Sequence, residues 1–236
     1  MKAFLLAGGL GTRLLPLTEH TPKCLVEIHG RALLDWWYDA MEKAGVTEVL
    51  INLHHLPGQV RSHVAAMDTG IRTHFFEEET LLGSAGTLRA NADFVKNEQA
   101  FFIIYADNLT SLPLHQLYRF HLQQSHPVTM ALFHTPTPKS CGIAVMDPAG
   151  TIISFVEKPQ VPVSDLANAG IYMASPGFID AIPVVKTPCD IGFDVLPLFV
   201  GRMSGWLMQD YLIDIGTPEN LERARREWPD VLASLP

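Results

Sequence analysis

The chain has 236 residues, 47% of them hydrophobic, and a formal net charge of -8. This length and apolar content suffice for the core of one α/β domain, so we expect a single domain over residues 1–236. The acidic balance argues against a nucleic-acid backbone or an anionic membrane as the main partner, because both require a basic surface. Any bound phosphate must then be held by a few local cations and backbone amides.

The three cysteines, Cys24, Cys141 and Cys189, are far apart in the sequence and form no CxxC pair. This spacing favours a reducing compartment over a disulfide framework. The N-terminal apolar run breaks at Gly8, too early for a signal-peptide core or a membrane span, and no later run is long enough to cross a bilayer. We therefore expect a cytoplasmic protein.

The first half of the chain alternates between apolar runs and helical patterns. The run at 2–7 ends in glycines, as expected for a strand that helices cover on both faces, and Gly45 stops a helical pattern that begins at Leu33. Such alternation predicts right-handed crossovers and a mostly parallel sheet. The expected strands are 2–7, 48–53, 72–76 and 100–105, and the expected helices are 33–44, 60–67 and 84–92.

The second half carries a different pattern. Two runs at 142–146 and 151–157 flank the turn residues Asp147-Pro148-Ala149-Gly150 and predict a hairpin. A stretch rich in proline and polar residues at 159–165 predicts a surface loop. Antiparallel strands should therefore be inserted into the parallel sheet. The other expected elements are strands at 128–133 and 167–173, helices at 114–124 and 176–182, and a closing helix at 218–227 with Thr217 as its N-cap.

The segment LAGGLGTR, residues 6–13, places three glycines, a hydroxyl group and an arginine directly after the first predicted strand. Glycine lets the backbone approach an anion and point its N–H groups at it, and a guanidinium group offers a forked donor to phosphate oxygens. The segment lacks the Lys-Ser/Thr pair of a P-loop, and Leu14 stands where the dinucleotide fingerprint GxGxxG requires glycine. Because glycine turns are common after strands, this loop alone is weak evidence for a phosphate site.

Lys23 strengthens the phosphate interpretation, and Asp107 marks an expected ligand-binding edge of the sheet. Lys23 follows Pro22, which stiffens the chain, so a second cation can reach the same phosphates. Asp107 follows the apolar run at 100–105, so its carboxylate should emerge at the carboxyl end of a strand, where open α/β sheets bind ligands. Taken alone, Lys23 would be interpreted as a solvated surface lysine, and Asp107 would more often belong to a helix cap or a turn.

With its downstream motifs, the segment LAGGLGTRLLPLTEHTPKCLV resembles the signature of the sugar-1-phosphate nucleotidyltransferases, in particular the mannose-1-phosphate guanylyltransferase-like group. The resemblance extends over nearly the whole chain. It implies a Rossmann-like nucleotidyltransferase fold, with the nucleotide over the N-terminal half, the sugar phosphate over the C-terminal half, and Mg²⁺ as cofactor. The downstream motifs are ETLLGSAG (79–86), YADN (105–108), FVEKP (155–159), NAG (168–170) and DIGT (214–217).

The resemblance also implies roles for individual residues. Arg13, Lys23 and Asp107 would be catalytic, with Lys23 neutralising charge at the α-phosphate under attack. Asp107 and Asp214 would bind Mg²⁺, which prefers oxygen ligands. The expected nucleotide-binding residues are Leu6, Ala7, Gly8, Gly9, Gly11, Thr12, Arg13, Glu79, Gly83 and Gly86. The expected sugar-phosphate-binding residues are Asn108, Gly142, Glu157, Lys158, Asn168 and Gly170.

Two positions depart from the family's pattern. Asn108 stands where relatives commonly have Asp or another acceptor, so it can serve through its carbonyl oxygen without adding charge. Cys24 replaces a proline found in many relatives, a change that affects loop stiffness rather than chemistry. Neither departure removes a group that the reaction needs.

The implied reaction is an in-line displacement, in which an oxygen of the sugar phosphate attacks the α-phosphorus of a nucleoside triphosphate and pyrophosphate leaves. Because the nucleophile is already an anion, catalysis reduces to positioning and charge neutralisation. The overall resemblance favours GTP with mannose 1-phosphate. Uridylyl, thymidylyl and cytidylyl transfer, and heptose or glucose phosphates, stay open alternatives.

Two other classes of function also stay open. The adjacent histidines His54 and His55 suggest a metal hydrolase as an alternative function. However, no HExxH motif is present, and neighbouring strand residues point to opposite faces of a sheet. A non-catalytic nucleotide-sugar sensor would retain the pocket without turnover. No added acyltransferase domain is expected after Asp214. Trp36, Trp37 and Trp206 leave room for an apolar homodimer interface.

Overall fold

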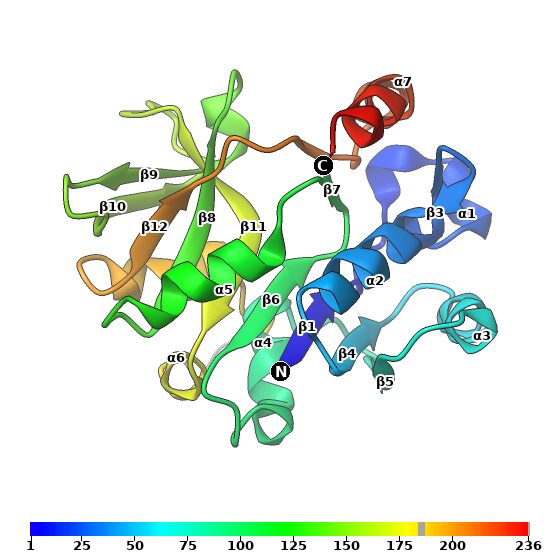
Figure 1. Ribbon diagram of the computed structural model, residues 1–236, viewed down its shortest axis with the longest axis horizontal. Coiled ribbons are helices and arrows are strands. Elements are labelled where there is room, and N and C mark those ends of the chain that lie inside the picture. Colours follow the sequence, from blue (N-terminus) through cyan, green and yellow to red (C-terminus); the bar gives the residue numbers. More distant parts are fainter. Residues whose placement is uncertain (184–186, 236) are drawn as a thin grey trace.

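The computed structural model describes residues 1–183 and 187–235. Within them, nine strands form one main sheet, and helices cover both of its faces (Figure 1). The main path of the sheet has the strand order β10-β9-β11-β6-β1-β4-β5. Strand β8 also pairs with β11, and β12 pairs with β8. This arrangement is the predicted α/β fold with inserted antiparallel strands.

The N-terminal half of the sheet is parallel. Strand β1 pairs with β4 on one side and β6 on the other, and β4 pairs with β5, all in parallel register. The predicted alternation of strands and helices is therefore confirmed. The elements are β1 (Lys2–Leu6), α2 (Leu33–Lys43), β4 (Glu48–Leu53), α3 (Pro57–Ala66), β5 (Arg72–Glu77), α4 (Ser84–Ala90) and β6 (Phe101–Tyr105).

Successive residues of the central strands enter two different cores, which explains the continuous apolar runs. Leu5 packs on the sheet face that is covered by α2 and α5 (Leu114–Leu122). Its neighbour Phe4 packs on the opposite face, beneath α4 and α6 (Pro176–Asp180). Figure 1 shows α2 and α5 in front of the sheet and α4 behind it. A strand segment buried on both faces needs apolar side chains at every position, and β1 has them from Ala3 to Leu6, whereas Lys2 stands at its partly exposed start.

The C-terminal half adds the antiparallel strands. In the predicted hairpin, Asp147 N donates to the carbonyl oxygen of Thr151 over 2.9 Å, which closes the turn between β9 and β10. Strand β11 runs antiparallel to β6 and so joins the two halves into one sheet. The strands are β8 (Val128–His134), β9 (Gly142–Met146), β10 (Ile152–Glu157), β11 (Leu166–Ala174) and β12 (Ser204–Leu207), the last of which the sequence pattern did not predict.

A separate two-stranded ribbon, also not predicted, is formed by β7 (Asn108–Thr110) and β13 (Leu212–Asp214). It leads into helix α7 (Pro218–Ser234), whose N-cap is the predicted Thr217, with its hydroxyl oxygen accepting from Asn220 N over 3.2 Å. The helix continues beyond the predicted end at 227. Trp228, buried to 2% exposure, packs edge-on against Trp36 and so anchors the extra turns.

The tryptophan interface suggested by the sequence needs one correction. Trp37 is only 2% exposed and belongs to the core beneath α2, because it lies on the inner face of that helix. It offers no surface to a second subunit. The α-helix and strands not yet named are short: α1 (Leu17–His20), β2 (Glu27–Ile28) and β3 (Arg31–Ala32), with β2 and β3 paired antiparallel. None of the helices in the described part of the chain is both long and apolar enough to span a membrane.

Candidate active site

The predicted catalytic residues gather where β1 and β6 end. These neighbouring parallel strands finish at the same edge of the sheet, so the glycine loop after β1 lies beside Asp107, which follows β6. Asp214 reaches the same edge from far along the chain, because β13 pairs with β7 and places Asp214 opposite Asn108. Ile215 N donates to the carbonyl oxygen of Asp107 over 3.0 Å and fixes this register.

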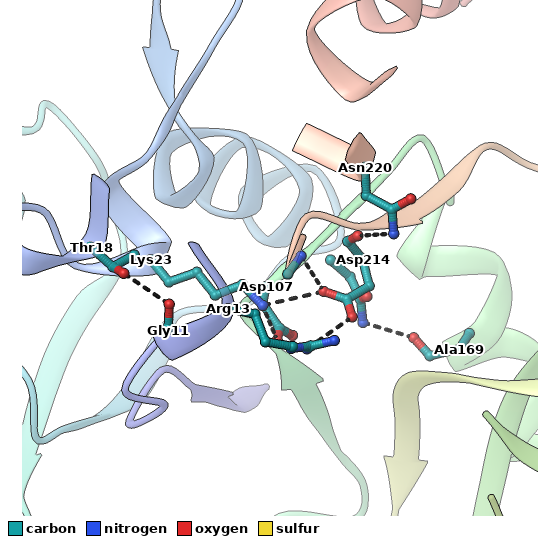
Figure 2. A network of polar contacts seen from close by, with 10 residues as sticks. Gly11, Arg13, Thr18, Lys23, Asp107, Ala169, Asp214 and Asn220 are labelled. Carbon is teal, nitrogen blue, oxygen red and sulfur yellow. Dashed lines mark hydrogen bonds and ion pairs between the residues drawn. The ribbon is translucent and has the colours of Figure 1, made fainter. Parts of the chain in front are cut away.

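A compact charge cluster results (Figure 2). Lys23 Nζ donates to Asp107 Oδ2 over 2.7 Å and to Asp214 Oδ1 over 3.2 Å, and its side chain is only 10% exposed. The more exposed Arg13 lies 3.6 Å from Asp214 Oδ2. The structure thus brings together both expected cations and both expected metal-binding carboxylates. Such a group presents positive and negative charge to the same small volume, as a phosphate–metal site requires.

Two residues that sequence reasoning missed hold this cluster in shape. Gly216 N donates to Asp214 Oδ1 over 2.7 Å, and a Cβ on Gly216 would lie 2.6 Å from the Arg13 guanidinium group and 2.8 Å from Lys23 Nζ. Asn220, in the first turn of α7, donates from Nδ2 to the carbonyl oxygen of Asp214 over 2.8 Å. The glycine in the DIGT motif was the available signal for the first of them.

A cavity of about 580 Å³ opens beside the charge cluster. Arg13, Asp107 and Asp214 line one side of it. Every residue that was expected to bind the sugar phosphate also lines it, although these residues come from β7, β9, β10 and β11 and from the loops beside them: Asn108, Gly142, Glu157, Lys158, Asn168 and Gly170.

Glu157 is the carboxylate at the sugar side of this cavity. Burial raises its pKa, the nearby Asp190 raises it further, and the adjacent Lys158 acts in the opposite direction. Its carboxylate has no hydrogen-bond partner among the described residues, so it is able to accept from a ligand. A Cβ on Gly142 would overlap Glu157 Oε2, which explains the glycine at that position.

The two asparagines of the cavity are partly committed to the protein. Asn108 Nδ2 donates to the backbone carbonyl oxygen of Ala169 over 2.9 Å. The side-chain oxygen of Asn108, which was expected to serve as the acceptor for a ligand, is not used in this bond. Asn168 Nδ2 donates to the Tyr172 hydroxyl over 2.6 Å, and Asn168 Oδ1 accepts from Gly170 N over 2.9 Å. Both side chains are therefore fixed before any ligand binds.

The glycine loop after β1 is shaped by the protein's own side chains. A Cβ on Gly8 would lie 2.6 Å from Asn52 Nδ2, and Asn52 Oδ1 also accepts from Ala7 N over 2.8 Å. Gly11 has a φ of 65° and packs against Thr18, whose hydroxyl donates to the Gly11 carbonyl oxygen over 2.8 Å. Only Gly9 has open space at its Cβ position. Gly8 and Gly11 are thus required by Asn52 and Thr18, whether or not a phosphate is bound.

The second predicted nucleotide loop also packs closely against the chain. A Cβ on Gly83 would overlap the carbonyl oxygen of Cys189, and Gly86 N donates to that oxygen over 3.2 Å. Leu6, Ala7, Thr12, Gly83 and Gly86 do not line the cavity described above. Their nucleotide contacts stay predictions.

Glu78, just before the segment at 82–86, is buried and was not predicted as a functional residue. Its neighbour Glu79, which was predicted to bind the nucleotide, is exposed. Glu78, only 4% exposed, accepts from Asn52 Nδ2 over 2.9 Å, from Thr87 Oγ1 over 2.5 Å and from Leu82 N over 2.9 Å. It therefore links the glycine loop, through Asn52, to the loop at 82–86. A run of three glutamates gave no signal to tell the buried one from the exposed ones.

The adjacent histidines do not act together. His54 Nδ1 lies 2.7 Å from the carbonyl oxygen of Glu78, and His55 Nε2 lies 2.7 Å from that of Thr18. Over residues 1–183 and 187–235, no group of three or more His, Cys, Asp or Glu side chains is arranged to hold a metal ion. The metal-hydrolase interpretation thus finds no supporting cluster in the described chain.

The sheet, the paired carboxylates and the cations beside a polar cavity define an α/β enzyme that acts on phosphates. Residues 2–230 match the family described as nucleotidyl transferase. The chain is 31% identical over 250 residues to mannose-1-phosphate guanyltransferase beta-A of Xenopus laevis, covering 100% of this chain and 69% of that protein. It is also 31% identical over 250 residues to the mannose-1-phosphate guanylyltransferase catalytic subunit beta of Danio rerio, with the same coverage.

Solved structures agree with this assignment. A protein named as a glucose-1-phosphate thymidylyltransferase from Bacillus anthracis superposes with a TM-score of 0.87 at 25% identity, covering 96% of this chain and 94% of that one. HddC from Yersinia pseudotuberculosis shares the fold, with a TM-score of 0.80 at 24% identity and coverage of 96% and 99%. The chain belongs to the nucleotidyl transferase family, and it is a sugar-1-phosphate nucleotidyltransferase.

Proposed function

We propose that the protein transfers GMP from GTP to mannose 1-phosphate, which gives GDP-mannose and pyrophosphate. The observation that carries this proposal is the charge cluster of Lys23, Asp107 and Asp214 at the wall of the cavity that Glu157 and Lys158 also line. The choice of base and sugar is supported by the names of the curated relatives, which are mannose-1-phosphate guanylyltransferases at 31% identity over the full chain.

In the proposed reaction, an oxygen of the sugar phosphate forms a bond to the α-phosphorus while the bond from that phosphorus to the bridging oxygen of pyrophosphate breaks. Lys158 would hold the phosphate of the sugar, and Lys23 would neutralise charge at the α-phosphate. Arg13 would bind the rest of the triphosphate through its forked donors. No proton has to be removed from the attacking anion, so no side chain needs to act as a base.

Asp107 and Asp214 are the residues that would hold Mg²⁺. Their carboxylates both reach Lys23 Nζ, so two hard oxygen ligands converge on one place. Two protein ligands suit an ion whose other positions are taken by phosphate oxygens and water. When bound, the ion supplies positive charge to the phosphates.

A second candidate is thymidylyl transfer to glucose 1-phosphate, which the named activity of the Bacillus anthracis structure favours. Uridylyl and cytidylyl transfer, heptose phosphates and a non-catalytic nucleotide-sugar sensor are further alternatives. The decisive assay is pyrophosphate release for the four common triphosphates against mannose, glucose and heptose 1-phosphates with Mg²⁺. We expect the highest kcat/KM for GTP with mannose 1-phosphate. A higher value for dTTP with glucose 1-phosphate would replace the substrate assignment, and nucleotide binding without any pyrophosphate release would identify a sensor.

The domain organisation and the cellular setting belong to the same proposal. Residues 1–236 would act as a single nucleotidyltransferase domain, because β11 joins both halves of the chain in one sheet. A cytoplasmic location is supported by the widely spaced cysteines, which favour a reducing compartment. A homodimer stays a proposal without a defined interface, and its measurement is the molar mass in solution by light scattering.

A further inference from the structure

The segment 189–193 lies between the loop at 82–86 and the sugar side of the cavity. The backbone N–H groups of Ala85 and Gly86 donate to the carbonyl oxygen of Cys189 over 3.0 and 3.2 Å. In return, Cys189 N donates to the carbonyl oxygen of Leu82 over 2.8 Å. The segment that contains the expected nucleotide-binding residues Gly83 and Gly86 is therefore bonded to a segment more than a hundred residues away in sequence.

One pair of side chains extends this attachment. Ser84 Oγ donates to Asp190 Oδ2 over 2.9 Å and accepts from Ile191 N over 2.8 Å. The other oxygen of that carboxylate, Asp190 Oδ1, accepts from Gly192 N over 2.8 Å and from Phe193 N over 3.1 Å. Asp190 thereby caps the π-helical turn Ile191–Val195, and both of its oxygens are used within the protein.

The turn that Asp190 caps forms part of the wall beside the expected sugar-phosphate residues. A Cβ on Gly192 would lie 3.0 Å from Glu157 Cδ and 3.2 Å from Asp190 Oδ1, so the turn packs directly against the Glu157 carboxylate. The Phe193 ring centroid lies 5.8 Å from Lys158 Nζ. Asp190, Gly192 and Phe193 all line the cavity. A shift of this turn would therefore move the surroundings of both Glu157 and Lys158.

We propose that Ser84 and Asp190 are positioning residues for the sugar pocket. Ser84 follows Gly83, which is expected to bind the nucleotide, yet the Ser84 hydroxyl bonds to the turn that packs against Glu157 and Lys158. Loss of that hydroxyl should loosen the turn and weaken binding of the sugar more than binding of the nucleotide. This inference rests on the proposed function for the assignment of Glu157 and Lys158 to the sugar phosphate.

The test compares two binding constants by calorimetry and does not depend on turnover. The probe is whichever of GDP-mannose, dTDP-glucose and UDP-glucose the unmodified protein binds most tightly, and the reference is its parent nucleoside diphosphate. For Ser84→Ala we expect about a tenfold increase in the Kd of the nucleotide sugar, the scale of one lost hydrogen bond to a charged group, with the Kd of the diphosphate unchanged. Ser84→Thr, which keeps a hydroxyl group, should restore most of the affinity. Ser234→Ala is the matched control, because that exposed hydroxyl donates to the carbonyl oxygen of Val231 at the end of α7 and, among the described residues, has no bond to the cavity.

A double-mutant cycle separates a specific link from general loosening. If Ser84 acts through Asp190, the double variant Ser84→Ala/Asp190→Ala should bind the nucleotide sugar no more weakly than Asp190→Ala alone. If the losses of affinity in the two single variants add up in the double variant, Ser84 does not act through Asp190. The proposal would also be overturned if Ser84→Ala weakened binding of the nucleotide sugar and of the diphosphate equally, or weakened neither. Thermal unfolding of each variant verifies that it is folded. If the unmodified protein preferred dTDP-glucose or UDP-glucose, the proposed substrates would be wrong, but the Kd values of the variants would still test the link between Ser84 and Asp190. If the unmodified protein bound no nucleotide sugar, both the proposed function and the role of Ser84 and Asp190 would be overturned.

Discussion

Asp214 lies opposite Asn108 in the antiparallel ladder of β7 and β13, and this register carries its carboxylate to the ammonium group that Asp107 also contacts. A ribbon of two three-residue strands thus brings the carboxylates of Asp107 and Asp214 together at the edge of a nine-stranded sheet. Lys23, at 10% side-chain exposure, is largely shielded from water between them. Removing Lys23 would leave the partly buried carboxylate of Asp107 without its ion-pair partner, which is costly.

Lys23→Ala and Asp107→Asn should each lower kcat at least about a hundredfold, the scale expected for loss of one charge contact in the transition state. The measurement is pyrophosphate release under saturating substrates. Lys96→Ala is the matched control, because that exposed lysine has Asp93 as its one ion-pair partner among the described residues. Turnover within about threefold of the unmodified protein in both site variants would contradict the assigned roles.

Gly216→Ala should reduce kcat by about tenfold or more, because the added methyl group would displace Lys23 or Arg13 by a fraction of an ångström. The exposed Arg13 is able to move aside, whereas Lys23 is held by two carboxylates. Thermal unfolding should change little, since the methyl group enters a polar edge and not the core. Gly177→Ala is a suitable control, because the Cβ position of Gly177 is open. An unchanged kcat for Gly216→Ala would show that Lys23 and Arg13 can move to accommodate the methyl group without loss of function.

The central strands of the main sheet were predictable from sequence, because each is buried on both faces and therefore forms an apolar run in the sequence, whereas β12 was not predicted. The small ribbon was not, since β7 and β13 are three residues each and their pairing depends on the fold around them. The sequence pattern also could not separate glycines that approach a ligand from those that approach the protein. Gly8 sits against Asn52 and Gly83 against Cys189, and neither partner is near in sequence.

Glu78→Gln should lower the free energy of unfolding by about 2 kcal/mol, because an amide cannot accept from all the donors that the Glu78 carboxylate satisfies. One of Asn52, Thr87 or Leu82 would then face the new NH₂ group. Urea unfolding monitored by tryptophan fluorescence provides the measurement. Glu79→Gln, one residue along the chain and exposed, should stay within about 0.5 kcal/mol. Equal stabilities of the two variants would refute the role of Glu78 as the link between the loops.

The raised pKa of Glu157 predicts a specific pH dependence. Below that pKa the carboxyl group is protonated and loses acceptor capacity, so the KM for the sugar phosphate should rise as pH falls, at a higher pH than for an ordinary carboxyl group. The phosphate of the substrate titrates as well, so the informative quantity is the ratio of KM for Glu157→Gln to KM for the unmodified enzyme. This ratio should approach one at low pH. A ratio that does not vary with pH would mean that the charge of Glu157 does not contribute to binding.

Stability should depend on pH through His121. Burial lowers its pKa from the ordinary 6.5 to about 4, with Nδ1 held 2.8 Å from Thr129 Oγ1. Between these values the unfolded chain binds a proton that the folded chain rejects, so stability should fall as pH drops from 6.5 to about 4, by up to about 3 kcal/mol. His121→Asn should remove this part of the slope. Parallel stability curves for the two proteins over that range would exclude His121 as the cause.

The central claim is nucleotidyl transfer at the cluster of Lys23, Asp107 and Asp214, and the most direct test follows both products of one reaction. GTP, mannose 1-phosphate and Mg²⁺ are incubated with the unmodified protein and with Asp214→Asn, and GDP-mannose and pyrophosphate are quantified together. We predict equimolar formation of the two products by the unmodified protein and at least about a hundredfold slower formation by the variant. Release of inorganic phosphate without a nucleotide sugar, or equal rates for the two proteins, would contradict the account.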